Sequence, residues 1–529
     1  MASLTRELLL RAPRAASALT SCLLLACAAG EVNDEGNFAE TSSDPTGDGD
    51  GDPTDPTTDG DLPSEGDGDG DGDTCTAEGC ACDPSPGSCD AGLGCTAGVC
   101  APAVCGNGVA EVPAEDCDDG NDFEGDGCDN DCTFTMVTAI EAGAFHTCAL
   151  IEGGRVRCWG LNNLGQLGYG NTTTIGDNED PAQPGDVVLG ENTEQLVVGS
   201  YHACARLSDD TLRCWGYNGN GQLGYGNTNN VGDDEFPFSV PPVGINVDLL
   251  DVAVGGFHTC AQVVGGNVRC WGYAAEGQLG YGNTTQLAVP LTIDVNLGTA
   301  TTLLAAGERH NCAALDDGKV RCWGLNANGQ LGYGNTENIG DNEIPGNVVP
   351  VPILPQGIPD GTPIVDLALG AFHSCAIFEG GDVLCWGDNF FGQLGQGTTT
   401  TVGDNETLAT VFPVDLGGNA VELAVGRYHT CALLDDGAVK CWGRNLYGQL
   451  GRGDITHVGD DEVPADVEVI DLPGEVTSLT AGDYHTCVVL DGHEVRCWGF
   501  NDYGQLGYAD TALRGDDETP DTLEAVRLF

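Results

Sequence analysis

Alternating apolar and polar residues recur along the last three quarters of the chain. In the first copy, residues 146–151 and 155–159 alternate in this way on either side of a Gly-Gly pair. A period of two predicts a half-buried β-strand, and glycines between two such stretches predict a hairpin turn. Pairing that is symmetric about the first glycine places Cys148 opposite Cys158, within the range of a disulfide. The pattern therefore predicts a hairpin joined by one disulfide.

The hairpin is part of a unit that occurs seven times. In each copy a His precedes a Cys by two residues, a second Cys follows ten residues later within Cys-Trp-Gly, and Gly-Gln-Leu-Gly comes next. The tryptophans of the seven copies are Trp159, Trp215, Trp271, Trp323, Trp386, Trp442 and Trp498. Their spacing of 52 to 63 residues indicates one structural module per repeat.

The two cysteines of every copy are predicted to form a disulfide. The pairs are Cys148–Cys158, Cys204–Cys214, Cys260–Cys270, Cys312–Cys322, Cys375–Cys385, Cys431–Cys441 and Cys487–Cys497. A metal site built from the His and the two Cys of one copy would lack the fourth ligand of a structural zinc site, so we favour disulfides. Each closes a short loop, for which chain entropy suggests about 2.5–3 kcal/mol of stabilisation.

The motifs Gly-x-x-His, Trp-Gly-x-Asn and Gly-Gln-Leu-Gly resemble the repeats of the regulator-of-chromosome-condensation family, over residues 137–529. The resemblance implies an all-β, seven-bladed β-propeller with four-stranded blades and one repeat per blade. Ring closure is expected to join residues 523–529 to the first blade near residues 137–141. A histidine present in every copy is expected to form structural hydrogen bonds, not to catalyse. The aromatic residue before six of these histidines predicts packing against a neighbouring blade.

The N-terminus has the pattern of a bacterial export signal. Three arginines precede an apolar stretch that is too short to span a bilayer. Residues 24–27 resemble the lipobox of bacterial lipoproteins, in which the cysteine, here Cys27, carries the lipid. Loss of Cys22 with the signal and lipidation of Cys27 leave an even number of cysteines to pair. We expect an exported protein, anchored by lipid at the outer membrane or surface of a Gram-negative bacterium. The alternative is an ordinary cleaved signal.

Composition divides the chain into four segments. They are a signal (1–26), an acidic Asp/Gly/Pro/Thr tether (27–74), a cysteine-rich module (75–135) and the propeller (136–529). The tether has almost nothing apolar to bury and its like charges repel, which predicts disorder. The ten cysteines of the third segment predict disulfides, because so short a segment cannot build a sufficient apolar core.

The cysteine-rich module also contains candidate metal ligands. Its second half looks like the short cysteine-rich repeats of myxobacterial surface proteins. The carboxylates of Asp118, Asp119 and Asp126 there are candidate ligands for Ca²⁺. A second acidic motif, Gly-Asp-(Asn/Asp)-Glu, follows the tryptophan in six repeats, and solvated turn carboxylates are favoured over calcium for it. We therefore expect no required cofactor, with Ca²⁺ as the one candidate.

One sector of the repeats is irregular. The third repeat has Ala274 where the others have Asn, and it lacks the acidic motif. The longest interval, after Trp323, holds a Pro-rich stretch at residues 344–363. A rigid loop on a rigid scaffold is suited to binding a partner, although a tolerated insertion is an equal alternative. The predicted partner-binding side chains are Ile344, Val351, Ile353, Leu354 and Ile358.

Charge and missing motifs narrow the function. The chain has 82 acidic and 18 basic residues, a net charge of −64 that repels nucleic acid. It contains no nucleophile elbow, zinc-hydrolase motif or phosphate-binding loop, which favours a non-enzyme. The leading hypothesis is a secreted or cell-surface scaffold, monomeric in its propeller, that presents one face to a protein or glycan. The alternatives are guanine-nucleotide exchange, implied by the resemblance but disfavoured by export, and a metal-assisted polysaccharide lyase or hydrolase.

Overall fold

The computed structural model describes residues 93–96, 99–102, 117, 127–129 and 133–529. The signal with Cys27, the tether, and the candidate calcium ligands Asp118, Asp119 and Asp126 lie outside the described residues and stay predictions. Within the described ranges, no helix has the length and apolar character needed to cross a membrane.

The chain divides into two compact units: residues 93–96 and 99–102 belong to the smaller one, and the other described residues belong to the larger one. In the smaller unit, β1 (Leu93–Thr96) and β2 (Val99–Pro102) form an antiparallel pair. In the larger unit, the cysteine-rich segment contributes one described disulfide, Cys117–Cys128. The sequence alone leaves the connectivity of these cysteines open.

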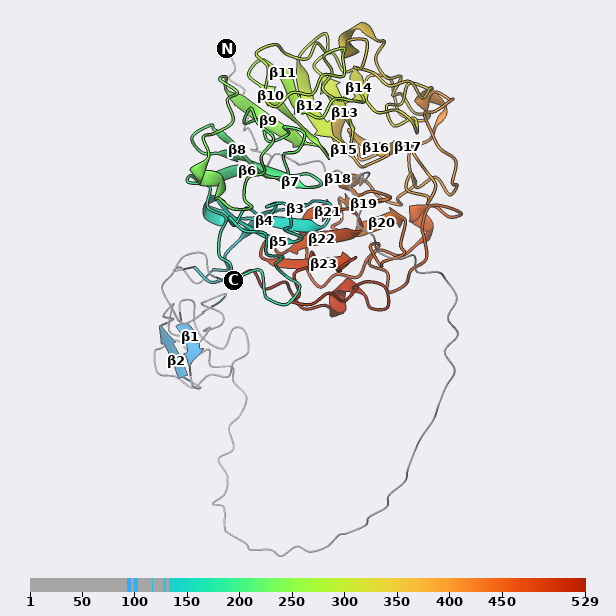
Figure 1. The fold of residues 1–529 in the computed structure, drawn as a ribbon. Helices are drawn as coiled ribbons and strands as arrows, with labels where there is room; N and C mark the ends of the chain where they lie inside the picture. The colour runs from blue at the N-terminus through green and yellow to red at the C-terminus, as the bar shows by residue number, and fades with distance from the viewer. Residues whose placement is uncertain (1–92, 97–98, 103–116, 118–126, 130–132) are drawn as a thin grey trace, which may run out of the picture. The chain divides into compact units, whose positions relative to one another are not determined.

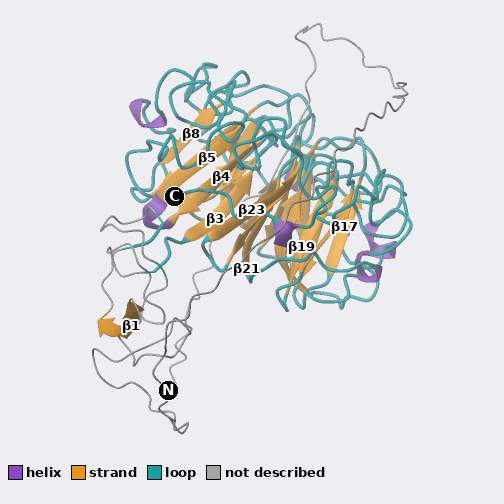
Figure 2. Ribbon diagram, turned by 90° about the horizontal axis from the view of Figure 1, so that it is seen from below, coloured by secondary structure: helices purple, strands orange, loops and turns teal. Residues whose placement is uncertain are grey.

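Seven three-stranded antiparallel sheets make up the rest of the larger unit and form the blades of a propeller (Figures 1 and 2). The first strands are β3 (Val137–Ala142), β6 (Thr193–Val198), β9 (Leu249–Val254), β12 (Thr301–Ala306), β15 (Ile364–Leu369), β18 (Ala420–Val425) and β21 (Val476–Ala481). The middle strands are β4 (His146–Ile151), β7 (His202–Leu207), β10 (His258–Val263), β13 (His310–Leu315), β16 (His373–Phe378), β19 (His429–Leu434) and β22 (His485–Leu490). The third strands are β5 (Arg155–Gly160), β8 (Leu212–Gly216), β11 (Asn267–Gly272), β14 (Val320–Gly324), β17 (Val383–Gly387), β20 (Val439–Gly443) and β23 (Glu494–Gly499).

Short 3₁₀ turns are the only helical elements among the described residues. They are η1 (Glu152–Gly154), η2 (Pro237–Ser239), η3 (Pro345–Asn347), η4 (Leu408–Thr410), η5 (Pro464–Asp466) and η6 (Pro520–Thr522). The first strands of neighbouring blades contact one another around the ring, so they form its inner wall.

The blades have three strands, which corrects the expectation of four. Where a fourth strand would lie, the loop after the third strand makes one β-bridge, such as Gly160 to Ile175, and one further hydrogen bond, from Val187 N to Val156 O at 2.8 Å. Gly, Asp and Pro lie between these two contacts, and such residues do not extend a β-ladder.

The predicted hairpins and disulfides are present in all seven blades. Cys148 lies opposite Cys158 in the register of β4 and β5, and the other six pairs are equivalent. All seven pairs are bonded, with Cα atoms 4.0–4.1 Å apart. One position of the hairpin turn, such as Gly154 or Asp210, has the positive φ of the left-handed region in six blades. In the seventh hairpin, Asp491 and Gly492 take positive φ and His493 does not.

Adjacent blades are joined by one repeated set of hydrogen bonds. The repeat tryptophans are fully buried, and each indole N–H donates to the backbone oxygen of the preceding blade's Gly-Gln-Leu-Gly glutamine, at 2.9–3.1 Å. In six blades the residue after the repeat His, such as Thr147, donates to the same oxygen.

The repeat histidines complete this set, which confirms their predicted structural role at six of the seven junctions. Each Nε2 lies 2.8–3.1 Å from the hydroxyl or amide oxygen of the next blade. Because each hydroxyl already donates its hydrogen to the glutamine oxygen, the imidazole Nε2–H is the donor. These histidines are therefore neutral links between blades.

The junction between the first and second blades lacks this link. Ala203 stands where the other blades have Thr, Ser or Asn, so it offers no hydroxyl to His146. Both ring nitrogens of His146 are buried without a hydrogen-bond partner among the described residues. An unpaired buried polar group costs stability, so this is the weakest of the seven junctions.

Ala203→Thr is expected to stabilise the propeller by about 1 kcal/mol, because the new hydroxyl can accept from His146 and donate to the oxygen of Gln166. Chemical denaturation of the wild type and the variant measures the change. Ala203→Val is the matched control, since it adds a side chain of similar shape without a hydroxyl. Equal stability of the Thr and Val variants would contradict the missing-link interpretation.

Ring closure also differs from the expectation. Residues 137–142 form the first strand of a blade built from one continuous stretch, and the C-terminal residues do not pair with it. Instead Val526 N donates to Val495 O in the last blade, and Arg527 O accepts from Ala182 N in the first. Closure uses the same contacts as the other junctions, with the Trp159 indole bonded to Gln505 O at 2.9 Å.

Candidate functional site

The turns between the first and middle strands converge at one end of the ring. Backbone hydrogen bonds join neighbouring turns, as from Ala144 N to Ser200 O at 3.2 Å and from Gly256 N to Glu308 O at 3.0 Å. Ala144 and Ala371, from the first and fifth blades, pack together and are fully buried. The turns therefore build a continuous surface at this end, on which the side chain before each repeat His is displayed.

Aromatic side chains form a contiguous cluster on this surface, across the fifth, sixth, seventh and first blades. Neighbouring ring centroids lie 5.0–6.5 Å apart, as aromatic pairs prefer. The aromatic–arginine surface, as we name it, consists of Phe145, Phe372, Phe391, Tyr428, Arg444, Tyr447, Tyr484, Phe500 and Tyr503. The contacts between blades confirm the packing expected of the residues before the histidines.

Arg444 lies at the centre of this surface. Its guanidinium carbon lies 5.0–5.8 Å from the centroids of four rings, those of Phe391, Tyr428, Tyr447 and Tyr484. Cation–π attraction at these distances holds the side chain in place. No carboxylate among the described residues lies within ion-pair distance of it. The cation is thus positioned by aromatic rings and left without a counter-charge of its own.

Exposed apolar side chains surround the cluster. Phe390 is 71% exposed and Leu446 is 45% exposed, and both stand beside members of the aromatic–arginine surface in sequence. Aromatic residues and arginine are the types that contribute most to protein interfaces, whereas isolated exposed apolar side chains are common on any surface. The combination in one patch marks a candidate binding surface.

Arg427 supports the surface from beneath. It lies 5.4 Å from the rings of both Phe372 and Tyr428, and 3.7 Å from the buried carboxylate of Asp483. Burial opposes the charge of Arg427, but the carboxyls of Asp483 and Glu308 outweigh it and raise the pKa of the guanidinium. Arg427 is thus a fixed, paired cation, in contrast to Arg444.

The Pro-rich stretch is placed differently from the expectation. Val351, Ile353 and Ile358 are 4–7% exposed and belong to the main apolar core, so they cannot contact a partner. Ile344 is half-buried. Leu354 is 42% exposed, and partner binding stays a prediction for Ile344 and Leu354. The stretch folds into the core because its apolar residues cover the outer edge of the fourth blade, where Val351 N donates to Val320 O.

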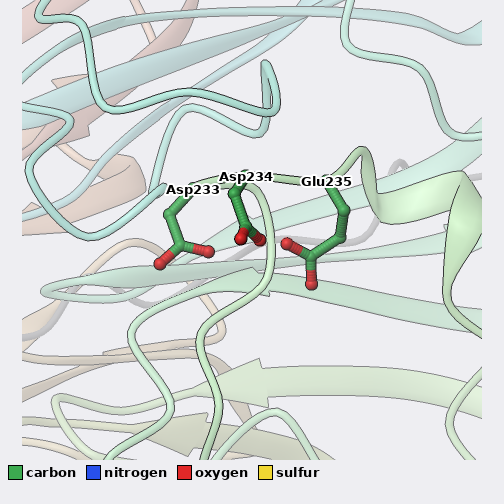
Figure 3. A group of neighbouring side chains, drawn as sticks. All are labelled: Asp233, Asp234 and Glu235. Carbon is green, nitrogen blue, oxygen red and sulfur yellow. The ribbon is translucent and has the colours of Figure 1, made fainter.

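Three acidic loops bring carboxylates together at a spacing that could hold a cation. Figure 3 shows one, in which the carboxylates of Asp233, Asp234 and Glu235 turn to the same side of the loop. The others are Asp460 to Glu462 and Asp516 to Glu518. Partial burial and then the neighbouring Asp234 carboxyl raise the pKa of Glu235 to about 7. Calcium binding here stays a prediction.

These loops also have a structural role. A Cβ added to Gly165 of the first blade would lie 2.4 Å from Asp233 N, so the loop of one blade packs directly on the Gly-Gln-Leu-Gly turn of its neighbour. This contact gives the acidic motif a packing function that needs no metal.

Sequence reasoning missed Arg444 and its rings. The residue after Cys-Trp-Gly is Leu, Tyr, Asp or Phe in the other repeats, so an arginine in one copy was a signal available in the sequence. Its significance depends on rings from three blades, which only the fold brings together.

Comparison with known proteins agrees with the repeat structure. A model of the RCC1-like domain matches residues 175–528, and a regulator of chromosome condensation (RCC1) repeat matches residues 137–166. The chain is 32% identical over 316 residues to the ultraviolet-B receptor UVR8 of Arabidopsis thaliana, covering 59% of this chain and 66% of the receptor. It is 29% identical over 357 residues to the E3 ubiquitin-protein ligase HERC2 of Homo sapiens, covering 67% of this chain and 7% of the ligase.

Solved structures show the same fold. Human WBSCR16 has a TM-score of 0.55 at 20% identity, over 67% of this chain and 86% of that one. Yeast RCC1 (Prp20), solved bound to Kap60, has a TM-score of 0.52 at 20% identity, over 65% of this chain and 78% of that one. The domain match covers more than half of the chain and agrees with the seven repeats and blades. The chain therefore belongs to the family of RCC1-like repeat proteins.

Proposed function

We propose that this protein is an exported binding scaffold that presents the aromatic–arginine surface to a protein or glycan outside the cell. The main observation that supports this proposal is the position of Arg444. Four rings hold this cation, and it has no carboxylate partner among the described residues. In a chain of net charge −64, such a site is a local exception that an acidic group of a partner would complement.

Binding of proteins has support within the family. Prp20p of Saccharomyces cerevisiae has binding properties towards Gsp1p and histones. These are properties of Prp20p itself. The present chain shares its fold at 20% identity. Nucleotide exchange and polysaccharide cleavage remain alternatives, and neither has a supporting side-chain arrangement on the aromatic–arginine surface. Export favours an extracellular partner.

Arg444→Ala is expected to weaken partner binding by about tenfold or more, as at a central interface residue. The measurement is retention of the bound partner from outer-membrane or culture fractions, followed by affinity measurement with the purified partner. Arg452→Ala is the matched control, because Arg452 lies in the same blade, carries the same charge and lies 3.7 Å from Asp454. If both variants bind as the wild type does, the aromatic–arginine surface is not the binding face.

Lipid attachment at Cys27 is part of the same proposal and rests on the lipobox-like residues 24–27. Labelling of the exported chain with palmitate tests it. The label should be lost in Cys27→Ala, and a variant that keeps the label would exclude Cys27 as the anchor.

A further inference from the structure

A cavity of about 930 Å³ lies at the centre of the ring. The first strands of the first and the third to seventh blades line it, from Glu141 and Thr480 to the hairpin turns at Glu379 and Asp435. Pockets for small molecules fall in this size range. The aromatic–arginine surface contributes no residue to this cavity, so the two sites are separate.

The charged side chains that line the cavity are all acidic. Six carboxyl side chains line the cavity, those of Glu141, Asp251, Asp366, Glu379, Glu422 and Asp435. Among the described residues, no Lys, Arg or His lines it. Low-dielectric walls strengthen the field of such a set of charges, so the cavity attracts cations.

Glu141 is the second and independent sign of a ligand. Its side chain is 8% exposed and lines the cavity, and it makes no hydrogen bond or ion pair with any other described residue. Burial, and then the charge of Glu422, raise the pKa of Glu141 well above its ordinary value. An ammonium group beside it would supply the counter-charge and the hydrogen-bond donors that the site lacks.

Asp251 is a cavity carboxylate that hydrogen bonds hold in place. Gln195 donates to its Oδ1 at 2.6 Å, and Val252 N donates to the same oxygen at 2.9 Å. Burial nevertheless raises the pKa of Asp251 to about 6, so it is ionised at neutral pH. The carboxylate is therefore held in one orientation on the wall.

The spacing of the carboxyls argues against a single metal ion. The described groups whose carboxylates come close enough to hold one are the three acidic loops outside the cavity. The six cavity carboxyls are spread over four blades, the first, third, fifth and sixth, and apolar side chains such as Ile140, Leu304 and Leu423 line the same cavity. Separated negative charges with apolar walls between them match separated positive charges joined by methylene groups.

We propose that the central cavity binds a linear aliphatic polyamine, with its ammonium groups on Glu141 and the other wall carboxylates and its methylene chain against the leucines. Thr138, Thr477 and Thr480 offer hydroxyl acceptors along the same wall. A cationic side chain of a peptide would meet the same chemistry, but a volume of about 930 Å³ favours a small molecule.

Calorimetric titration of the full chain with spermidine tests the proposal. Glu141→Gln should weaken spermidine binding by about tenfold or more, because it removes one buried ion pair. Glu191→Gln is the matched control, since it removes one exposed carboxylate outside the cavity and outside the acidic loops, and it should leave the affinity unchanged. n-Hexylamine, a monocation with a similar chain, should bind less tightly than spermidine.

Asp251→Asn is the second variant, used if Glu141→Gln does not fold, and it should weaken binding in the same direction. Circular dichroism establishes that each variant is folded. The proposal is overturned if folded Glu141→Gln or Asp251→Asn binds spermidine as the wild type does. It is also overturned if Glu191→Gln weakens binding equally, because spermidine would then be a diffuse counter-ion of the acidic chain.

Discussion

Denatured protein whose seven blade disulfides have been reduced is expected not to refold, whereas denatured protein with intact disulfides should recover its fold. Each bridge closes a loop with a sequence separation of 10 residues, for which chain entropy gives about 2.5–3 kcal/mol. Seven such terms amount to about 18–21 kcal/mol, more than the net stability of an ordinary domain, which is about 5–15 kcal/mol. Fluorescence of the seven buried tryptophans follows refolding directly.

The native protein should resist the same reductant. All fourteen blade cysteines are 0–3% exposed, so a thiol reaches the bridges only after a blade opens. A variant that lacks one bridge, with both Cys204→Ala and Cys214→Ala, should still fold but lose about 2.5–3 kcal/mol of stability. Recovery of the native fluorescence by the fully reduced chain, or free thiols at the seven pairs in folded protein, would refute this account.

Acid is expected to unfold the propeller steeply below pH 4.5. Burial lowers the pKa of six of the seven repeat histidines to about 3, and that of His258 to about 4. The unfolded histidines take up protons below their ordinary pKa of 6.5, while the folded ones stay neutral, so stability falls as pH falls.

Carboxyls with raised pKa values oppose this loss at higher pH. Glu235, Glu462 and Glu518 have a pKa of about 7 in the fold, raised first by partial burial, and they add stability as pH falls from 7 towards 4.5. Below 4.5 the same carboxyls are protonated in both states and their contribution becomes constant. In this range the seven histidines contribute about 1.4 kcal/mol per proton and pH unit, or about 8–10 kcal/mol per unit together.

The dependence of the denaturation midpoint on pH between 4.5 and 3.5 measures how many protons the chain takes up when it unfolds. His146→Gln should reduce this uptake by one proton, and it breaks no hydrogen bond, because His146 has no partner among the described residues. A proton uptake near zero in this window would show that the histidines do not control acid stability.

Much of the fold could be predicted from the sequence because its determinants are local. The hairpin register that opposes Cys148 and Cys158 depends on the fourteen consecutive residues 146–159, and the repeats multiply that evidence seven times. The outer edge of each blade could not be predicted in this way. Whether a loop rich in Gly, Asp and Pro pairs as a strand depends on packing that its composition does not encode.

The candidate sites were less accessible from the sequence. Val351 and Ile358 looked like a surface loop because proline surrounds them, yet both are buried in the core. The cage around Arg444 joins residues from three blades, and the cavity carboxyls come from four blades. Assemblies of residues from distant repeats follow from the geometry of the ring, and the spacing of residues within one repeat does not predict them.

The junction between the last and first blades has a consequence for how such rings arise. It uses the same tryptophan and histidine bonds as the other junctions, and no strand crosses it. Each blade is therefore an exchangeable cassette with one contiguous coding segment. Rotating the order of the seven cassettes, so that translation began with the fourth, would build the same ring.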